Sequence, residues 1–308
     1  MAQLVEHRSP KPRVVGSSPS APARPDAAPL PEGWPASVAL HVGAHKTAST
    51  HFQKGLRRGR PGLERAGISL WTPPELRLGG RLVDQFGVSF RTRARRDDWD
   101  PARVARLAAG KRRLVISEEN ILGSFGGRRG GEGPALYPNA AARLSTFLAG
   151  VAPLQVSVFL TIRDPASFLV SAWSQSLFGG FGGPFEDFLA GLPLHEVDWA
   201  GLVTRLAQVA GVRDITVWRK EDYPAVAARA LDALAGRRMS RPGWFDHPPV
   251  HLGMSAAAAA EALAAPRGNH RAQVAAEARR RHALGPDNPP AAPFDEEARA
   301  ASADFYAA

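Results

Sequence analysis

The chain has 308 residues, of which 44% are hydrophobic and 22% charged, proportions that are typical of a globular protein in water. It has no cysteine, which excludes disulfides, thiolate catalysis and cysteine-ligated metals, and no apolar run approaches the roughly 18 residues of a membrane span. The net charge is +10 and all but five of the 39 basic residues are arginine, which fits an anionic ligand or, alternatively, a GC-rich genome.

Residues 1–36 contain eight of the 27 prolines, with serine and alanine between them. Such a segment cannot bury a core, so we expect a disordered leader before a domain over residues 37–308. A second interpretation is that the leader is a translated transfer-RNA gene and that the natural start lies between Glu32 and Val38. The leader has no apolar signal-peptide core, and we therefore expect a cytoplasmic protein.

From Ser37 onward, short apolar runs alternate with amphipathic segments. The predicted strands are residues 37–42, 112–117, 155–162 and 214–218. The predicted helices are one that starts near Thr47, and residues 138–149, 165–178, 199–211, 224–235, 256–265, 270–282 and 294–308. Asp164, Asp198 and Ser255 are the expected N-caps.

Strands that are apolar throughout and alternate with helices favour a parallel sheet with both faces covered. We therefore predict an α/β fold of three layers with a central parallel sheet of four to five strands. Ligands of such folds bind at the C-terminal ends of the strands, which directs attention to residues 43–50, 118–123 and 163–171.

The first of these loops, GAHKTAST at residues 43–50, combines a glycine bend, a lysine and a helix start. Backbone N–H groups converge at a helix N-terminus, and the helix dipole adds partial positive charge there. Lys46 supplies a full charge, and Thr47, Ser49 and Thr50 supply hydroxyl donors. The loop is therefore predicted to hold a phosphate-like anion.

This loop departs from the Walker pattern, because His45 stands where that pattern requires a glycine before the lysine. We expect a shorter loop that surrounds a single phosphate group. The alternative is a tight turn with a surface lysine.

The third loop begins with Arg163, which ends the clearest predicted strand. Ser171 lies eight residues further on, about two turns into the next helix. An arginine and a serine so placed can hold one phosphate from two sides. The alternative is a structural ion pair of Arg163.

The first loop and the later pattern R-D-P-x5-S together resemble the sulfotransferase family that uses 3′-phosphoadenosine 5′-phosphosulfate (PAPS). The segments LHVGAHKTASTHFQKGL, ISEENILGS and FDEEARAASADFY are similar to bacterial members, so that the resemblance covers residues 37–308. It implies a fold like that of P-loop nucleoside triphosphate hydrolases. It also implies PAPS as the cofactor and a hydroxyl-bearing acceptor, either a carbohydrate or another small molecule.

The resemblance further implies residue roles. Lys46 would contact the 5′-phosphosulfate and stabilise the departing phosphate, while Arg163 and Ser171 would hold the 3′-phosphate. The remaining residues expected to line the phosphosulfate site are Gly43, His45, Thr47, Ala48, Ser49 and Thr50. Ala48 and Ser49 replace residues that are more usual in the family, glycine or threonine and threonine respectively, and both keep the loop small.

Transfer to a hydroxyl requires a base, because an alcohol is a weak nucleophile at neutral pH. Glu118 and Glu119 follow the predicted strand 112–117, and the resemblance favours Glu119, with Glu118 as runner-up. Neighbours on an extended segment point in opposite directions, so only one is expected to enter the site. His45 is a third candidate base, and both carboxylates could instead be solvated or act as caps.

Further expectations concern metals, partners and rival functions. No metal is expected, because a sulfuryl group carries less charge than a phosphoryl group. No nucleic-acid-binding motif is present. The glycine-rich segment 123–138, with Arg128 and Arg129, is either a lid over the acceptor or a surface loop. The rival functions are a P-loop kinase and a non-catalytic module that binds polyanions.

Overall fold

The computed structural model of the protein describes residues 30–77, 86, 102–126, 136–190, 192–248, 253–266 and 270–307. Residues 1–29 of the expected leader lie outside this description, as do Arg128 and Arg129 of the expected lid.

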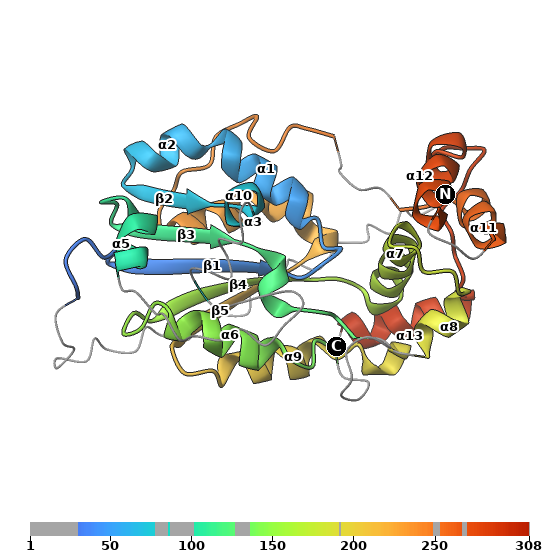
Figure 1. The fold of residues 1–308 in the computed structure, drawn as a ribbon, viewed down its shortest axis with the longest axis horizontal. Coiled ribbons are helices and arrows are strands. Elements are labelled where there is room, and N and C mark those ends of the chain that lie inside the picture. The colour runs from blue at the N-terminus through green and yellow to red at the C-terminus, as the bar shows by residue number, and fades with distance from the viewer. Residues whose placement is uncertain are drawn as a thin grey trace, which may run out of the picture.

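The core of the fold is a parallel sheet with the strand order β2-β3-β1-β4-β5 (Figure 1). The strands are β1 (Ser37–Gly43), β2 (Ile68–Trp71), β3 (Arg113–Ser117), β4 (Val156–Ile162) and β5 (Val212–Arg219). The predicted α/β fold with a parallel sheet of four to five strands is thus confirmed. The sequence analysis missed β2, because four residues are too few to show a hydrophobic period.

Helices cover both faces of this sheet (Figure 1). One layer consists of α1 (Ser49–Arg58), α2 (Arg60–Arg65) and α10 (Tyr223–Ala235), and the other of α5 (Ala102–Ala108), α6 (Ala140–Ala149) and α9 (Trp199–Ala207). Along β1, Val38, Leu40 and Val42 are buried in the core under α5, α6 and α9, whereas Ala39 is buried under α1, α2 and α10. The three-layer arrangement follows from this alternation.

A second group of helices lies beyond the C-terminal ends of the strands (Figure 1). It comprises α7 (Pro165–Phe178), α8 (Phe185–Leu189) and three helices called here the C-terminal helices, α11 (Ala256–Ala264), α12 (Arg271–Arg281) and α13 (Glu296–Ala307). The short helices are α3 (Pro73–Arg77), η2 (Glu119–Leu122), η3 (Leu194–Glu196) and η4 (Lys220–Asp222). None of the helices within the described ranges is long and apolar enough to cross a membrane.

The N-caps expected from the sequence are confirmed. Asp164, Asp198 and Ser255 each accept a hydrogen bond from the backbone N–H three residues further on. The expected end of α9 at Gly211 is wrong, because α9 ends at Ala207 and the next residues form the turn that leads into β5.

Candidate functional site

The loop between β1 and α1 exposes a series of backbone donors. Lys46 and Ala48 adopt left-handed backbone conformations, with φ of 61° and 67°, which are uncommon for residues other than glycine. The N–H groups of residues 46–50 meet no hydrogen-bond acceptor among the described residues, and they surround the N-terminus of the ten-residue helix α1. Unpaired N–H groups with a helix dipole behind them bind anions, so this loop is a candidate anion site.

Other residues of the same loop stabilise this backbone conformation. Thr47 Oγ1 and Ser49 Oγ donate to the carbonyl oxygen of Ala44, at 2.7 and 2.8 Å. A Cβ atom at Gly43 would lie 2.8 Å from the Cβ atom of Glu119, so only glycine permits this approach, and its φ of 89° also favours glycine. The Gly43 backbone and the Thr47 hydroxyl therefore shape the loop, while the N–H group of Thr47 remains among its unpaired donors.

His45 is fixed by a closed set of hydrogen bonds. Its Nε2 group donates to Asn120 Oδ1 at 3.0 Å, because an amide oxygen can only accept. Nδ1 is then the acceptor for the Tyr137 hydroxyl at 2.9 Å, and the His45 backbone N–H donates to the same hydroxyl at 3.0 Å. Burial is the main cause that lowers the pKa of His45. A neutral ring with both nitrogens occupied is poorly suited to act as the base.

Arg163 joins the loop after β4 to the loop after β1. Its Nη1 group donates to the carbonyl oxygen of Lys46 at 2.9 Å, and its Nε group donates to Ser167 Oγ at 2.9 Å. Ser171 lies one turn beyond Ser167 on the same face of α7, and both border the cavity described below. The structure thus brings together Lys46, Arg163 and Ser171.

Lys46 has no carboxylate within salt-bridge distance among the described residues. Burial, followed by the charges of Arg163 and Arg279, lowers the pKa of Lys46 to about 8. An ammonium group in this position is stabilised when an anion enters, because the anion supplies the missing opposite charge.

The two adjacent glutamates occupy different environments. Glu118 is fully buried, its Oε2 and Oε1 atoms accept from Arg77 Nε and Nη2 at 2.9 and 2.7 Å, and burial raises its pKa. Glu119 borders the cavity and accepts from Gln53 at 2.8 Å and from Arg77 at 2.8 Å. Burial alone would raise the pKa of Glu119, but Arg77, His45 and the Gln53 hydrogen bond together lower it. Glu119 is therefore an ionised carboxylate that faces the cavity, and Glu118 is a buried ion-pair partner.

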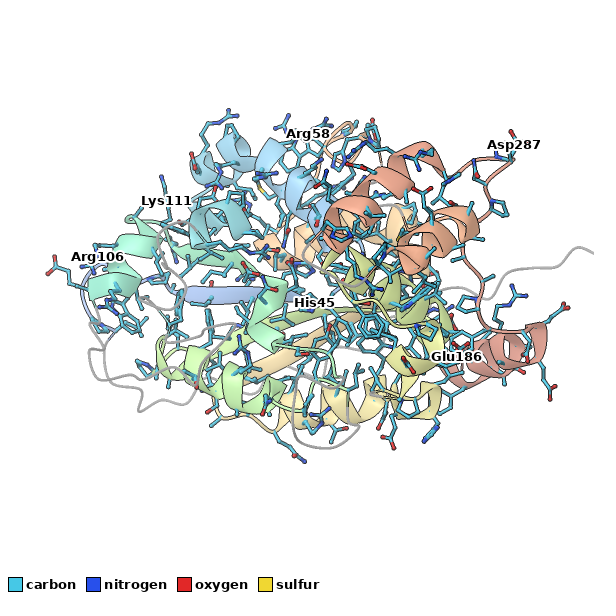
Figure 2. All side chains as sticks on the ribbon, turned by 45° about the vertical axis from the view of Figure 1, so that its right-hand side comes forward. His45, Arg58, Arg106, Lys111, Glu186 and Asp287 are labelled. Carbon is cyan, nitrogen blue, oxygen red and sulfur yellow. The ribbon has the colours of Figure 1, made fainter. Side chains whose placement is uncertain are left out.

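Lys46, Glu119, Arg163 and Ser171 border one cavity of about 1300 Å³ at the C-terminal ends of the strands. Its charged lining residues are the basic Lys46, Arg77, Arg163, Lys220, Arg279 and Arg299 and the acidic Glu119, Asp164, Glu221 and Asp246. Figure 2 shows His45 at the centre of the molecule, between the sheet and the C-terminal helices, with Arg58 and Asp287 on the outside. The excess of basic side chains favours an anionic ligand.

Helix α13 fixes the carboxylates that lie behind Arg163. Ser302 Oγ donates to Asp164 Oδ2 at 2.9 Å and accepts from the backbone N–H of Ala166 at 3.0 Å. The Tyr306 hydroxyl donates to Glu221 Oε2 at 3.1 Å. A helix far along the chain thus holds the loop that carries Arg163.

Aromatic side chains form another part of the cavity wall. Phe245 and Tyr223 border the cavity, and so does His51, whose Nε2 group donates to the carbonyl oxygen of His247 at 2.9 Å. The His51 Nδ1 atom accepts from the Tyr223 hydroxyl at 2.7 Å. Both ring nitrogens of His51 are therefore occupied by structural hydrogen bonds.

The sequence analysis missed several site residues. Gln53 lies one turn after Ser49 on α1, so the helical period could have indicated that it faces the site. Arg77 lies 41 residues from its partner Glu118, and Tyr137 lies 92 residues from its partner His45. No local sequence pattern predicts contacts over such separations. Within the described ranges, no three His, Asp or Glu side chains are grouped as ligands of a metal ion.

Comparisons of the chain with models of known protein families, with curated proteins and with solved structures found no match.

Proposed function

We propose that the protein is a sulfotransferase that moves a sulfuryl group from PAPS to the hydroxyl of an acceptor, on a fold related to P-loop nucleotide-binding proteins. The observation that carries the proposal is the meeting of two positive centres in one cavity. The first is the loop of unpaired N–H groups with Lys46, and the second is Arg163 with Ser171. A ligand with a phosphosulfate and a separate phosphate requires two such centres.

The residues present fit this ligand. The N–H groups of residues 46–50 and the uncompensated Lys46 supply what a phosphosulfate needs, namely donors and one full positive charge. Among the described residues, the Nη2 group of Arg163 has no hydrogen-bond partner, while its Nη1 and Nε groups hold the two loops. PAPS supplies the activated sulfuryl group, and the charge of that group makes a resident metal unnecessary.

The chain then contributes two chemical steps at named atoms. The Glu119 carboxylate, kept ionised by Arg77 and by the hydrogen bond from Gln53, accepts the proton of the acceptor hydroxyl as the hydroxyl oxygen attacks sulfur. Each oxygen of Glu119 accepts one protein hydrogen bond and retains a lone pair for this proton. Lys46 and the loop N–H groups stabilise the negative charge that develops on the leaving phosphate.

Ligand binding tests the proposal directly. Calorimetry with adenosine 3′,5′-bisphosphate, the product of the donor, is compared with calorimetry with ATP and Mg²⁺. We expect binding and thermal stabilisation by the bisphosphate, because stabilisation follows RT ln(1 + [L]/Kd) for the true ligand. Stronger stabilisation by ATP and Mg²⁺, with metal-dependent turnover of ATP, would instead identify the rival kinase.

Transfer by the Lys46→Ala variant separates an enzyme from a module that only binds polyanions. Loss of one charge-stabilising group lowers kcat by about 10²–10³ in comparable sites, and we expect a loss of that size here. Sulfate transfer from PAPS is measured beside binding of the bisphosphate. A wild-type protein that binds the bisphosphate but transfers no sulfate to any acceptor would be the binding module.

A further inference from the structure

The cavity is larger than one small ligand requires. Its volume of about 1300 Å³ exceeds the roughly 300–1,000 Å³ that is usual for a site of one ligand. The proposed donor uses the end that is formed by the loop after β1, Arg163 and the first turns of α7. The other end, formed by the C-terminal helices and the segments that join them, is then available to the acceptor.

The C-terminal segment gives this second end an almost entirely apolar wall, beside Ser174 and Gln175 of α7, which also border the cavity. Residues of the segment 253–303 that border the cavity include Met254, Leu284, Pro290, Ala291, Phe294 and Ala303. Among the described residues of that segment, only Arg279 and Arg299 bring polar side chains to the cavity. A sugar ring needs several hydrogen-bonding side chains, whereas this wall suits an apolar body with one charged group.

The two arginines lack carboxylate partners within the described part of the chain. Arg279 lies over the ring of Phe178, with its Cζ atom 5.3 Å from the ring centre, and Arg299 donates only to the backbone oxygen of Asp295. By contrast, Arg281 on the same helix as Arg279 pairs with Glu261. Glu261 thus neutralises Arg281, which does not border the cavity, whereas no acidic side chain of the described residues pairs with either cavity arginine.

Arg279 also affects Lys46, which is central to the proposed chemistry. After burial and Arg163, it is the third cause that lowers the pKa of Lys46. The free cation of the apolar wall therefore faces the same space as the loop that would hold the phosphosulfate.

We infer that the acceptor is a hydroxyl-bearing organic acid with an apolar body, whose carboxylate is held by Arg279 and Arg299 while the body lies on the apolar wall. This inference rests on the proposed function and replaces the carbohydrate among the acceptors expected from the sequence. The acceptor oxygen bonds to sulfur as the bond between sulfur and the phosphate oxygen breaks. The hydroxyl proton passes to Glu119, and adenosine 3′,5′-bisphosphate and a sulfate ester are released.

The test compares acids with their uncharged amides. Calorimetry on protein saturated with adenosine 3′,5′-bisphosphate measures binding of p-hydroxyphenylpropanoate and ω-hydroxydodecanoate, of the two amides, and of N-acetylglucosamine. We expect at least one acid to bind about tenfold or more tightly than its amide, as for a hydrogen bond to a charged group, and the sugar to bind most weakly. With PAPS, the same acid should be the preferred acceptor.

Two matched variants test whether Arg279 causes the preference for the acid over its amide. Arg279→Gln should remove the preference for the acid over its amide, and any loss of bisphosphate affinity should be smaller than the loss of affinity for the acid. Arg280→Gln, a neighbour that does not border this cavity, should keep the preference.

Equal binding of acids and amides, preference for the sugar, or an equal loss for all compounds in Arg279→Gln would overturn the inference and leave the sulfotransferase proposal standing. Failure of the bisphosphate to bind the wild-type protein is a different result, because it would overturn the proposed function and the acceptor assignment together.

Discussion

Lys46 combines a left-handed backbone conformation with a half-buried ammonium group that has no carboxylate partner among the described residues. Its pKa of about 8 makes ligand affinity depend on pH. The ammonium form prevails below pH 8 and is lost as the pH rises through that value. A phosphate group, with a second pKa near 6, is already fully charged above pH 7, so Lys46 alone changes in this range.

We therefore expect affinity for adenosine 3′,5′-bisphosphate to fall about tenfold between pH 7 and pH 9, because an empty site with a lysine of this pKa loses its charge over that interval. Isothermal calorimetry at several pH values measures the change. Lys46→Arg is the control, since a guanidinium stays charged, and its affinity should vary little. A flat profile for the wild-type protein would contradict this account of Lys46.

The adjacent glutamates should respond differently to the same substitution. Glu118→Gln removes one partner of a buried ion pair and should lower the free energy of unfolding by about 2–3 kcal/mol, below the full cost because Arg77 is partly exposed. Glu119→Gln should unfold at nearly the wild-type temperature but lose transfer by about 10²–10⁴, as expected for a base. Thermal unfolding and transfer rates are measured for both variants. The assignment is refuted if Glu118→Gln loses transfer while Glu119→Gln loses stability.

At this scale the sequence predicted which loops meet at the candidate site better than it predicted the contacts of their residues. The short pattern around Lys46 and the strand-end Arg163 are local signals, and the fold brings them together as two loops at one sheet edge. The partners of these residues are not local. The backbone N–H of His45 donates to the hydroxyl of Tyr137, so this N–H group is not available to a ligand. No spacing in the sequence predicts this contact.

At the scale of elements, two glycines let a loop pack closely on α1. A Cβ atom at Gly55 would overlap the ring of Phe245, and one at Gly59 would overlap the ring of Trp244. Phe245 borders the cavity, so this packing positions one wall of the site.

Gly55→Ala should therefore lower the free energy of unfolding by about 1–3 kcal/mol and weaken bisphosphate binding, because overpacking displaces Phe245. Gly62→Ala is the matched control, since its Cβ atom would lie 3.6 Å from Trp244, an ordinary contact. Chemical denaturation and calorimetry on both variants measure the effects. A Gly55→Ala protein as stable as Gly62→Ala would show that the ring moves without cost.

The attachment of α13 offers a second prediction for an element. Ser302→Ala removes the donor to Asp164 and leaves the N–H of Ala166 buried without a partner, so we expect a loss of about 1–2 kcal/mol in the free energy of unfolding. The exposed Thr204→Ala should change it by less than about 0.5 kcal/mol. Denaturant titrations measure both, and equal effects would mean that α13 does not hold the Arg163 loop.

The elements themselves were largely predictable, because caps and apolar runs are local. Asp164, Asp198 and Ser255 begin their helices as expected. Two errors have physical causes: β2 is too short to show a period, and the end of α9 is decided by where β5 must begin.

At the scale of the whole molecule, the net charge of +10 says less about anion binding than the position of each charged residue does. Lys220 borders the cavity and lies close enough to Arg163 for that arginine, after burial, to lower its pKa. Lys111 lies on the outside, away from His45, just before the N-terminal end of β3 (Figure 2).

Lys220→Gln should weaken bisphosphate binding about tenfold at low salt, and Lys111→Gln by less than about twofold, although both remove one unit of charge. Calorimetry at two salt concentrations measures both, and the difference should shrink at high salt, where charges are screened. Similar losses in the two variants would indicate that net charge, and not the cavity, attracts the ligand.

The strand order has a consequence for synthesis of the chain. β1 lies between β3 and β4, yet it is the first of these strands to leave the ribosome, and about 70 residues separate its end from the start of β3. At about 5–20 residues per second, both edges of an apolar strand stay unpaired for roughly 4–14 s. Unpaired edges can pair with other chains, and the translation speed over residues 44–112 sets how long β1 is exposed to such pairing.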